Sequence, residues 1–328
     1  MKKLENYLER IDENIFIHGL DLKSFHCKHS KKVMPIIENK FHFSTYYYWI
    51  QGKSPIPISV LKIFSRVDKN VLDKAYKEMK AASVGNKKIF LPKKFDKKLA
   101  YLIGSIHGDG GMHKNQKYVT IANDSKEYLE DMISILFQDI FKVRTRVSKF
   151  KNIYRAEVGS RAVCSFLSLF CPFGKKTGLL HIPKEVKSDE KLKISYLSGL
   201  FDTDGCIGYG KNNTYFTFVQ RDKIFVFEVY ECLKSLGIHV NEPKIFYSPV
   251  KPYSEGRDLE EWRIYIGSKK DLYNLLSKIS FYHPSKKTKA EKVKVIVGLV
   301  GFEPTTFSIL SSARQGNVIA SRPQAHKT

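Results

Sequence analysis

The sequence of 328 residues has few cysteines, few acidic residues and no long apolar run. Its five cysteines are odd in number and form no Cys-x-x-Cys pair, which excludes a disulfide scaffold and a zinc knuckle. A transmembrane helix needs about 18 consecutive apolar residues, and no such run occurs. The N-terminal residues also lack the apolar stretch of a secretory signal. We therefore expect an intracellular protein, in the cytoplasm or nucleoid, with no membrane partner.

Positive charge is in large excess. Lys and Arg number 56 against 33 Asp and Glu, which gives a formal net charge of +23. Hydrophobic residues make up 42% of the chain, so a folded protein is expected rather than a disordered basic tail. A net positive charge of this size favours nucleic acid as the partner. A lysine-rich proteome is the alternative explanation, because 45 of the 56 basic residues are lysine.

The first 84 residues contain several short stretches with apolar residues at helical spacing, joined by tight turns. This pattern predicts a small all-α domain of helix-turn-helix type over residues 1–84. A helical cap that only packs on the main body is the alternative. Residues 85–98 are rich in lysine and are predicted to form a basic linker.

Beyond the linker the pattern changes to alternating helices and strands. Residues 145–159 and 206–220 each alternate around a central polar turn, which predicts two β-hairpins. Residues 260–268 alternate as well, with Trp262 and Ile264 on one face and Arg263 on the other. The region is predicted to be a mixed α+β fold.

An internal repeat is the most informative feature of the chain. LAYLIGSIHGDGGM (99–112) matches ISYLSGLFDTDGCI (194–207), and each copy is followed by a strand, a side-chain amide and an amphipathic helix. Both copies end in a similar basic segment, PFGKKTG (172–178) and HPSKKTK (283–289). We therefore assign residues 99–187 to a first repeat and 188–297 to a second. Residues 298–328 lack either periodicity and are predicted to be a disordered tail.

Small residues recur at a spacing of four in both repeated helices. Gly104 and Gly108 match Gly199 and Thr203. Residues at this spacing lie on one helix face, and small ones allow a second helix to approach closely. The sequence therefore predicts that the two repeated helices pack on each other.

Each repeated helix ends in an Asp-Gly pair, at Asp109 and at Asp204. A carboxylate at a helix C-terminus opposes the macrodipole at a cost of about 0.3–1 kcal/mol. Two such carboxylates on adjacent helices would also repel each other, which suggests a divalent cation between them. An ordinary Asp-Gly turn is the alternative for each copy taken alone.

These residues resemble the LAGLIDADG homing endonucleases in their single-chain, two-motif form. LSGLFDTDG (197–205) differs from the family name at three positions, and LIGSIHGDG (102–110) is a more divergent copy. The resemblance implies two pseudo-symmetric αββαββα repeats that form a DNA-binding saddle. It also implies a monomeric enzyme that hydrolyses both strands of a long, specific DNA target with Mg²⁺ or Mn²⁺.

The resemblance also assigns roles to residues. Asp109 and Asp204 would bind the metal, helped by the carbonyls of Gly108 and Thr203. Gln220, with Asn123 as its shorter counterpart, would orient water. A lysine near the end of each repeat would stabilise transition-state charge. Lys286 and Lys175 are the candidates, and Lys287 and Lys176 stand one residue away.

One position departs from the family pattern. The earlier acid of the motif is Asp202 in the second copy and His107 in the first. In the family the later acid carries the metal, so the resemblance does not require an acid here. A place on the helix surface is the other interpretation of His107.

The strands would supply the surface that reads DNA, since Arg, Asn and Lys side chains can contact base edges and phosphates. The candidates for DNA contact are Arg144, Arg146, Ser148, Arg155, Lys211, Asn212, Asn213, Arg221, Lys244, Arg257 and Arg263.

Two functions remain open at this point. The first is the homing endonuclease, for intron homing. The second is a protein on the same fold that binds nucleic acid without cutting it, such as a maturase for intron RNA or a DNA-binding regulator.

Overall fold

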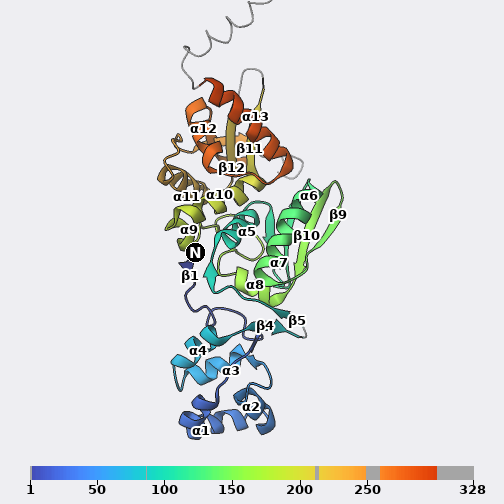
Figure 1. Cartoon of the computed structure of the whole chain (residues 1–328), viewed down its shortest axis with the longest axis vertical. Coiled ribbons are helices and arrows are strands. Elements are labelled where there is room, and N and C mark those ends of the chain that lie inside the picture. Colours follow the sequence, from blue (N-terminus) through green and yellow to red (C-terminus); the bar gives the residue numbers. More distant parts are fainter. Residues whose placement is uncertain (1, 86, 211–213, 249–258, 301–328) are drawn as a thin grey trace, which may run out of the picture.

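The computed structural model describes residues 2–85, 87–210, 214–248 and 259–300. Three regions follow one another along its longest axis: an N-terminal region, the first repeat and the second repeat (Figure 1). Within the described residues no helix is both long and apolar enough to cross a membrane.

Two helices at the centre hold the repeats together. They are α5 (Lys97–His107) and α10 (Glu190–Asp204). Each begins at an aspartate whose carboxylate accepts a backbone N–H: Asp96 from Leu99 at 2.9 Å, and Asp189 from Leu192 at 3.0 Å. Nearly all side chains of α5 are buried, because the facing helix covers one side and the first sheet the other.

The close approach of α5 and α10 depends on glycine. A Cβ atom at Gly104 would overlap the backbone carbonyl of Tyr196, and one at Gly199 would overlap the carbonyl of Tyr101. A Cβ at Gly108 would overlap the Thr203 hydroxyl. The structure thus brings all four predicted interface positions into one helix–helix contact.

Each repeat builds an antiparallel four-stranded sheet with the same strand order. The first sheet is β7-β8-β10-β9 and the second is β11-β12-β14-β13. The strands of the first are β7 (Gly110–Met112), β8 (Tyr118–Asn123), β9 (Arg146–Phe150) and β10 (Ile153–Gly159). Those of the second are β11 (Gly205–Tyr209), β12 (Thr214–Gln220), β13 (Lys244–Ser248) and β14 (Leu259–Ile266).

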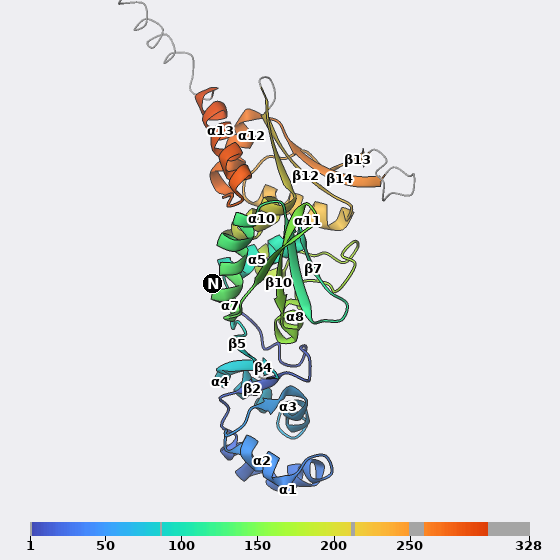
Figure 2. The same ribbon diagram turned by 90° about the vertical axis from the view of Figure 1, so that its right-hand side faces the viewer.

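Helices complete each αββαββα unit. In the first repeat they are α6 (Lys126–Tyr128), the π-helix η1 (Leu129–Ser134), α7 (Ile135–Phe141) and α8 (Arg161–Leu167). In the second they are α11 (Lys223–Ser235), α12 (Lys269–Lys278) and α13 (Pro284–Val300), with α9 (Lys184–Lys187) before α10. Figure 2 shows the two sheets following each other along the long axis, with α7, α12 and α13 on one side. The predicted mixed α+β class with paired repeats is confirmed.

The predicted hairpins are confirmed by strand pairing. Ile153 pairs with Phe150 across a turn in which Lys151 has a φ of 54°, and Tyr209 pairs with Thr214. In β14, Ile264 and Ile266 are buried and Tyr265 is exposed, as the alternation predicts. Alternation was reliable here because one face of each sheet packs on helices.

The N-terminal region is not purely helical, and this part of the prediction is wrong. Its four helices are α1 (Lys23–Glu38), α2 (Phe43–Ile50), α3 (Ile58–Ser65) and α4 (Asn70–Glu78). Beside them lies a four-stranded antiparallel sheet, β3-β2-β4-β5. Its strands are β2 (Phe16–His18), β3 (Ile56–Pro57), β4 (Ala81–Val84) and β5 (Lys87–Ile89). Strands of two to four residues are too short to show a period of two in a sequence.

The segment predicted as a linker is also structured. Residues 85–98 contain β5, which pairs with β4, and β6 (Lys94–Phe95), which pairs with β1 (Lys2–Lys3). Ile89 and Phe95 are buried. The lysines between them made the segment look like a linker. A strand at the edge of a sheet tolerates charge on its open side, so these lysines are compatible with strand pairing. Of the predicted tail, residues 301–328 lie outside the described residues.

Candidate active site

The two motif carboxylates lie where the central helices end. Asp204 is the last residue of α10, and Asp109 follows Gly108, which terminates α5. The position of a Cβ on Gly108 would be 3.3 Å from the Asp204 carboxyl carbon, so the two helix ends are in contact. Both acids therefore belong to one site, although 95 residues separate them in the chain.

In this arrangement the pKa values of both carboxyl groups, Asp109 and Asp204, are raised. Burial, and then the negative charge of Asp109, raise the pKa of Asp204 to about 7. The pKa of Asp109 is raised as well, because the surrounding protein displaces water from the carboxylate, although part of its side chain is open to solvent. Positive charge at this point would lower both pKa values and relieve the repulsion.

An amide side chain contacts each carboxylate. Gln220, at the end of β12, donates from Nε2 to Asp204 Oδ2. Asn123, at the end of β8, donates from Nδ2 to Asp109 Oδ2 at 3.3 Å. The shorter amide thus still reaches its carboxylate, at the long end of the hydrogen-bond range. The structure therefore gives both acids the same kind of partner at matching positions.

A lysine ammonium caps the end of each central helix. Lys286 Nζ donates to the carbonyl oxygens of Phe201 (3.1 Å) and Thr203 (2.7 Å). In the first repeat Lys176 Nζ donates to the carbonyls of Ile106 (3.2 Å), His107 (2.9 Å) and Gly108. Burial lowers the pKa of both ammonium groups.

Lys175, the lysine predicted for the first repeat, does not occupy this position. Lys175 is exposed, and Lys176 occupies the place that corresponds to Lys286. Lys286 lies in the first turn of α13, whereas Lys176 lies in a loop that follows Gly174, whose φ is 73°. A helix and a loop advance differently per residue, so aligning the two Lys-Lys pairs gives a register error of one.

His107 is fully buried, which rules out the helix-surface interpretation. Its Nε2 lies 3.0 Å from the carbonyl oxygen of Phe170, which can only accept, so Nε2 carries the proton. Nδ1 then accepts from the Tyr196 hydroxyl at 2.7 Å. Burial lowers the pKa of His107 to about 4, so the ring is neutral at physiological pH.

Asp202 plays the matching part in the second repeat. It accepts from the Tyr101 hydroxyl (2.6 Å) and from the backbone N–H groups of Tyr282 (2.8 Å) and His283 (3.1 Å). Its side chain is buried. This position therefore ties each central helix to its partner helix and to the segment that precedes the lysine.

His283 is a site residue that the sequence analysis missed. Its Nε2 lies 2.9 Å from Asn123 Oδ1 and 3.1 Å from Asp124 Oδ1, so it donates from the second repeat into the first. Asn123 Oδ1 also accepts from the Ser125 backbone at 2.9 Å. These two bonds turn the amide so that Nδ2 faces Asp109. The signal was present in HPSKKTK, three residues before Lys286, but no pattern indicated its partner.

The donor set fits a hard divalent cation. Within the described part of the chain, no group of three or more His, Cys, Asp or Glu side chains is placed to hold a metal. A cation here would be held by Asp109 and Asp204, with the carbonyl oxygens of Gly108 and Thr203. Carboxylate and carbonyl oxygens are the ligands that Mg²⁺ and Ca²⁺ take. A cleft of about 450 Å³ opens beside these groups, and Asp109, Thr203 and Lys286 are in its lining.

The predicted DNA contacts fall into three groups. Arg155 pairs with Ser148 and Lys244 with Arg263, so each pair shares one face of its sheet. The second group lies near acidic residues or before a strand. Arg146 on β9 pairs with Glu157, and Arg144 precedes that strand. Arg221 Nε lies 3.9 Å from Glu261. Lys211, Asn212, Asn213 and Arg257 lie outside the described residues.

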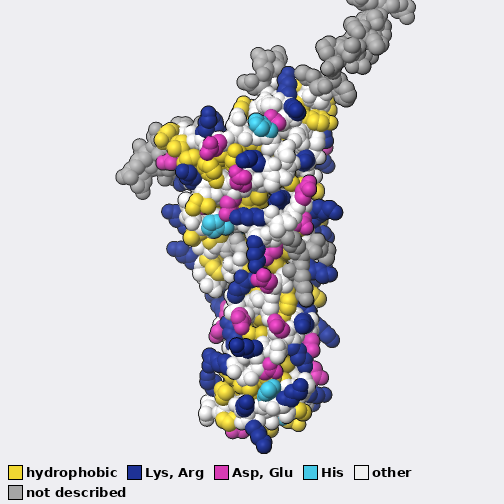
Figure 3. All heavy atoms as spheres, turned by 90° about the vertical axis from the view of Figure 1, so that its left-hand side faces the viewer, with side chains coloured by type: hydrophobic (Ala, Val, Ile, Leu, Met, Phe, Trp, Pro, Cys, Tyr) yellow, Lys and Arg dark blue, Asp and Glu magenta, His cyan; other side chains and the backbone are white. Residues whose placement is uncertain are grey.

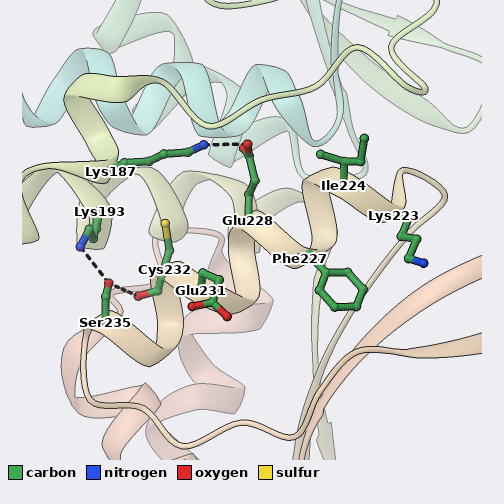
Figure 4. Close-up of a pocket in the computed structure, with 9 residues that line it drawn as sticks. All are labelled: Lys187, Lys193, Lys223, Ile224, Phe227, Glu228, Glu231, Cys232 and Ser235. Carbon is green, nitrogen blue, oxygen red and sulfur yellow. Dashed lines mark hydrogen bonds and ion pairs between the residues drawn. The ribbon is translucent and has the colours of Figure 1, made fainter.

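The charge count alone does not locate a DNA surface. On the face shown in Figure 3, Lys and Arg side chains extend over the whole length of the molecule with Asp and Glu between them. The same mixture occurs in a separate pocket of about 620 Å³ on α11 (Figure 4). There Lys187 is 2.6 Å from Glu228 and Lys193 is 2.8 Å from Ser235. This pocket shares no lining residue with the cleft at the carboxylates.

Comparisons with known proteins give a family match and a relative that is similar over part of its length. Residues 191–280 match the family model of the LAGLIDADG-like domain. The uncharacterized protein MJ0314 of Methanocaldococcus jannaschii is 27% identical over 123 residues, which are 36% of this chain. The match spans 44% of that relative's length.

Two solved structures illustrate the similarity in backbone trace. One is I-DmoI in complex with DNA and Ca, at 16% identity and a TM-score of 0.42, covering 60% of this chain and 97% of that one. The other is full-length DUF199/WhiA from Thermatoga maritima, at 15% identity and a TM-score of 0.42, covering 67% of each chain. The family match covers residues 191–280 of this chain, which resemble the LAGLIDADG-like domain.

Proposed function

We propose that this protein is a site-specific DNA endonuclease of the homing type that hydrolyses phosphodiester bonds with a divalent metal, Mg²⁺ or Mn²⁺. The observation that carries the proposal is the pair of carboxylates at adjoining helix ends, each with its own amide and its own lysine. Burial, and then the negative charge of Asp109, raise the pKa of Asp204 to about 7. An ordinary Asp-Gly turn does not explain why two carboxylates are held at a place where ionising Asp204 is unfavourable.

The chain's own groups divide the chemistry between them. When bound, a divalent cation supplies charge neutralisation at the phosphate and a more acidic water. Asp109 and Asp204 would hold it, and Gln220 and Asn123 fix the orientation of these carboxylates by hydrogen bonds. Lys176 and Lys286 place positive charge beside the site, where it stabilises the extra negative charge of the transition state.

Duplex DNA would lie across the two sheets, with the carboxylates beneath its centre. Arg155 and Ser148 share one sheet face, and Lys244 and Arg263 share a face of the other. Such side chains can read base edges, whereas the many lysines hold phosphates. The internal repeat supplies both halves of the site from one chain, so we propose that the protein acts as a monomer.

The decisive experiment is cleavage of a randomised duplex library with and without Mg²⁺, followed by sequencing of the cut ends. We expect cut ends that share one sequence, only when metal is present, and none with Asp204→Asn. Asp131→Asn is the matched control, because this exposed carboxylate lies on η1 away from the central helix ends. Equal cutting by Asp204→Asn and the wild type would overturn the proposal.

A second candidate function is sequence-specific nucleic-acid binding without cleavage, on DNA or on intron RNA. The observation that favours it is that Lys176 and Lys286 already donate to the carbonyls of Gly108 and Thr203, the oxygens expected to help hold a metal. The same library distinguishes the two functions. Enrichment of bound duplexes without any metal-dependent cut would favour the binder.

A further inference from the structure

A basic cleft lies between the N-terminal region and the first repeat. It has a volume of about 400 Å³ and is formed by β5, by the segment after α7 and by the turn from β10 into α8. Figure 1 shows β5 at this junction, below α8. Five of its lining residues are cationic: Lys87, Lys88, Lys142, Arg144 and Arg161. The cleft thus joins two parts of the chain that the sequence analysis treated as separate.

The lining of this cleft differs from that of four other clefts in the described structure. Those clefts each include at least one carboxylate, for example Glu228 on α11 or Asp109 beside the candidate site. The lining of the basic cleft includes none. In a protein whose cations and acids are otherwise mixed, five cations around one hollow are a local exception.

Two acids outside the lining interact with these cations. The charge of Lys142 helps, after Lys98, to lower the pKa of Asp139. Arg161 Nε lies 3.8 Å from Asp12. Among the described residues, no carboxylate lies within ion-pair distance of Lys87, Lys88, Lys142 or Arg144. The positive potential reaches neighbouring groups: after burial, Lys88 is the second cause that lowers the pKa of His18. A concave surface of one charge sign attracts a polyanion.

The position of the cleft indicates which polyanion it fits. Arg144 stands two residues before Arg146 on β9, a residue proposed to contact DNA, so the basic surface continues from the first sheet into the cleft. The N-terminal region extends the long axis beyond the first repeat, on the side away from the second (Figure 1). A duplex lying along both sheets would reach this cleft when it extends past the first repeat.

We propose that this cleft binds the sugar–phosphate backbone of duplex DNA beyond the first repeat, which makes the DNA footprint longer on that side. The proposal rests on the proposed DNA binding but not on cleavage. Lysine ammonium groups contact phosphates as point charges, and Arg144 and Arg161 can bind phosphate oxygens with two N–H groups. The contacts add affinity and salt dependence without reading sequence.

The test compares two triple variants of equal charge. Lys87→Gln, Lys88→Gln and Lys142→Gln together remove three cations of the cleft. Lys191→Gln, Lys269→Gln and Lys270→Gln remove three exposed lysines of the second repeat. Glutamine keeps most of the chain length, and it preserves the left-handed backbone at position 142 as well as lysine does.

The measurement is the affinity for a long random-sequence duplex in EDTA, as a function of salt concentration. The slope of log K against log salt is negative, and each lost phosphate contact reduces its magnitude by about 0.9. We expect the magnitude of this slope to fall by about 2 to 3 in the cleft variant and by less than about 0.5 in the control variant. Thermal melting of both variants establishes that they are folded.

Three outcomes would overturn the proposal. Equal slopes for the two variants would mean that only net charge matters. An unchanged slope for the cleft variant would mean that no phosphate is bound there. A loss confined to a duplex RNA of the same length would make RNA the ligand. Because EDTA prevents metal-dependent cutting, a failure of the proposed endonuclease activity leaves this result unaffected.

Discussion

The two repeats place the same two groups, an amide and a lysine, beside their carboxylates, but they hold the central helices by different contacts. In the second, Asp202 accepts three hydrogen bonds, from Tyr101 and from the loop before α13. In the first, His107 bonds to Tyr196 and to the carbonyl of Phe170. An acid and a neutral imidazole thus perform one structural task at equivalent positions. The comparison shows that this motif position holds the helix pair together, whereas the later Asp is the residue proposed to hold the metal.

The hydrogen bonds made by the two amide side chains, Asn123 and Gln220, also differ. Asn123 is fixed by Ser125 and by His283, which reaches it from the second repeat. Gln220 contacts its carboxylate directly from the end of β12. The carboxylate and amide of the first repeat therefore depend on the second repeat for their geometry, through His283 in the loop before α13.

The largest expected effect tests whether the two carboxylates serve one site. Asp204→Asn and Asp109→Asn should each reduce metal-dependent cleavage by at least about 10²- to 10³-fold, because each removes a charged metal ligand. DNA affinity measured in Ca²⁺ should change by less than about threefold, since neither group is in the proposed reading surface. Loss of binding in parallel with loss of cleavage would show that these acids are structural.

The next effect tests the lysine register. Lys176→Met should lower cleavage by about 10²-fold, because the ammonium group beside the helix end is lost. Lys175→Met should leave it within about twofold, since this neighbour is exposed. Lys286→Met and Lys287→Met form the matching pair in the second repeat. Equal losses from the two members of a pair would contradict the assignment.

A smaller and one-sided effect is expected at His283. His283→Phe removes the donor to Asn123 and should slow cleavage of one DNA strand by about tenfold, with the other strand nearly unaffected. The readout is the ratio of the two nicked products on a supercoiled plasmid. His283→Gln can still donate to Asn123 and should restore the ratio; if it does not, His283 acts through packing alone.

The smallest effect is on stability in the absence of metal. The folded-state pKa of Asp204 is raised from 3.8 to about 7, so between these values the folded protein binds a proton that the unfolded chain has lost. The free energy of unfolding should therefore fall as pH rises through this window. Asp204→Asn should remove the contribution of Asp204 to that dependence and raise Tm at pH 8 by a few degrees, on the order of 5 °C.

The control for this measurement is Asp131→Asn, which should change Tm by less than about 1 °C because this carboxylate is exposed. Adding Mg²⁺ should stabilise the wild type and have little effect on Asp204→Asn. A wild-type Tm that rises between pH 4 and pH 7 together with that of the variant would contradict the assigned shift.

Much of the core architecture was predictable, because it follows from local patterns. The hairpin around Lys151 and the alternation through Ile264 and Ile266 depend on periods of two that are complete within a few residues. The paired motif helices could be predicted because the repeat itself marks them. The short strands of the N-terminal region could not, since β2 and β3 have three and two residues.

The sequence by itself determined the two repeats, the glycine stripe at Gly104 and Gly199 and the two acids, since each is a pattern of residue type and spacing along the chain. Only the tertiary structure decided that Lys176 rather than Lys175 reaches the helix end, and that His283 holds Asn123. It also gathered five cations into one cleft between the N-terminal region and the first repeat. The physical reason is that these contacts join residues about 70 to 160 positions apart, or depend on how a loop advances, and neither is encoded in a local period.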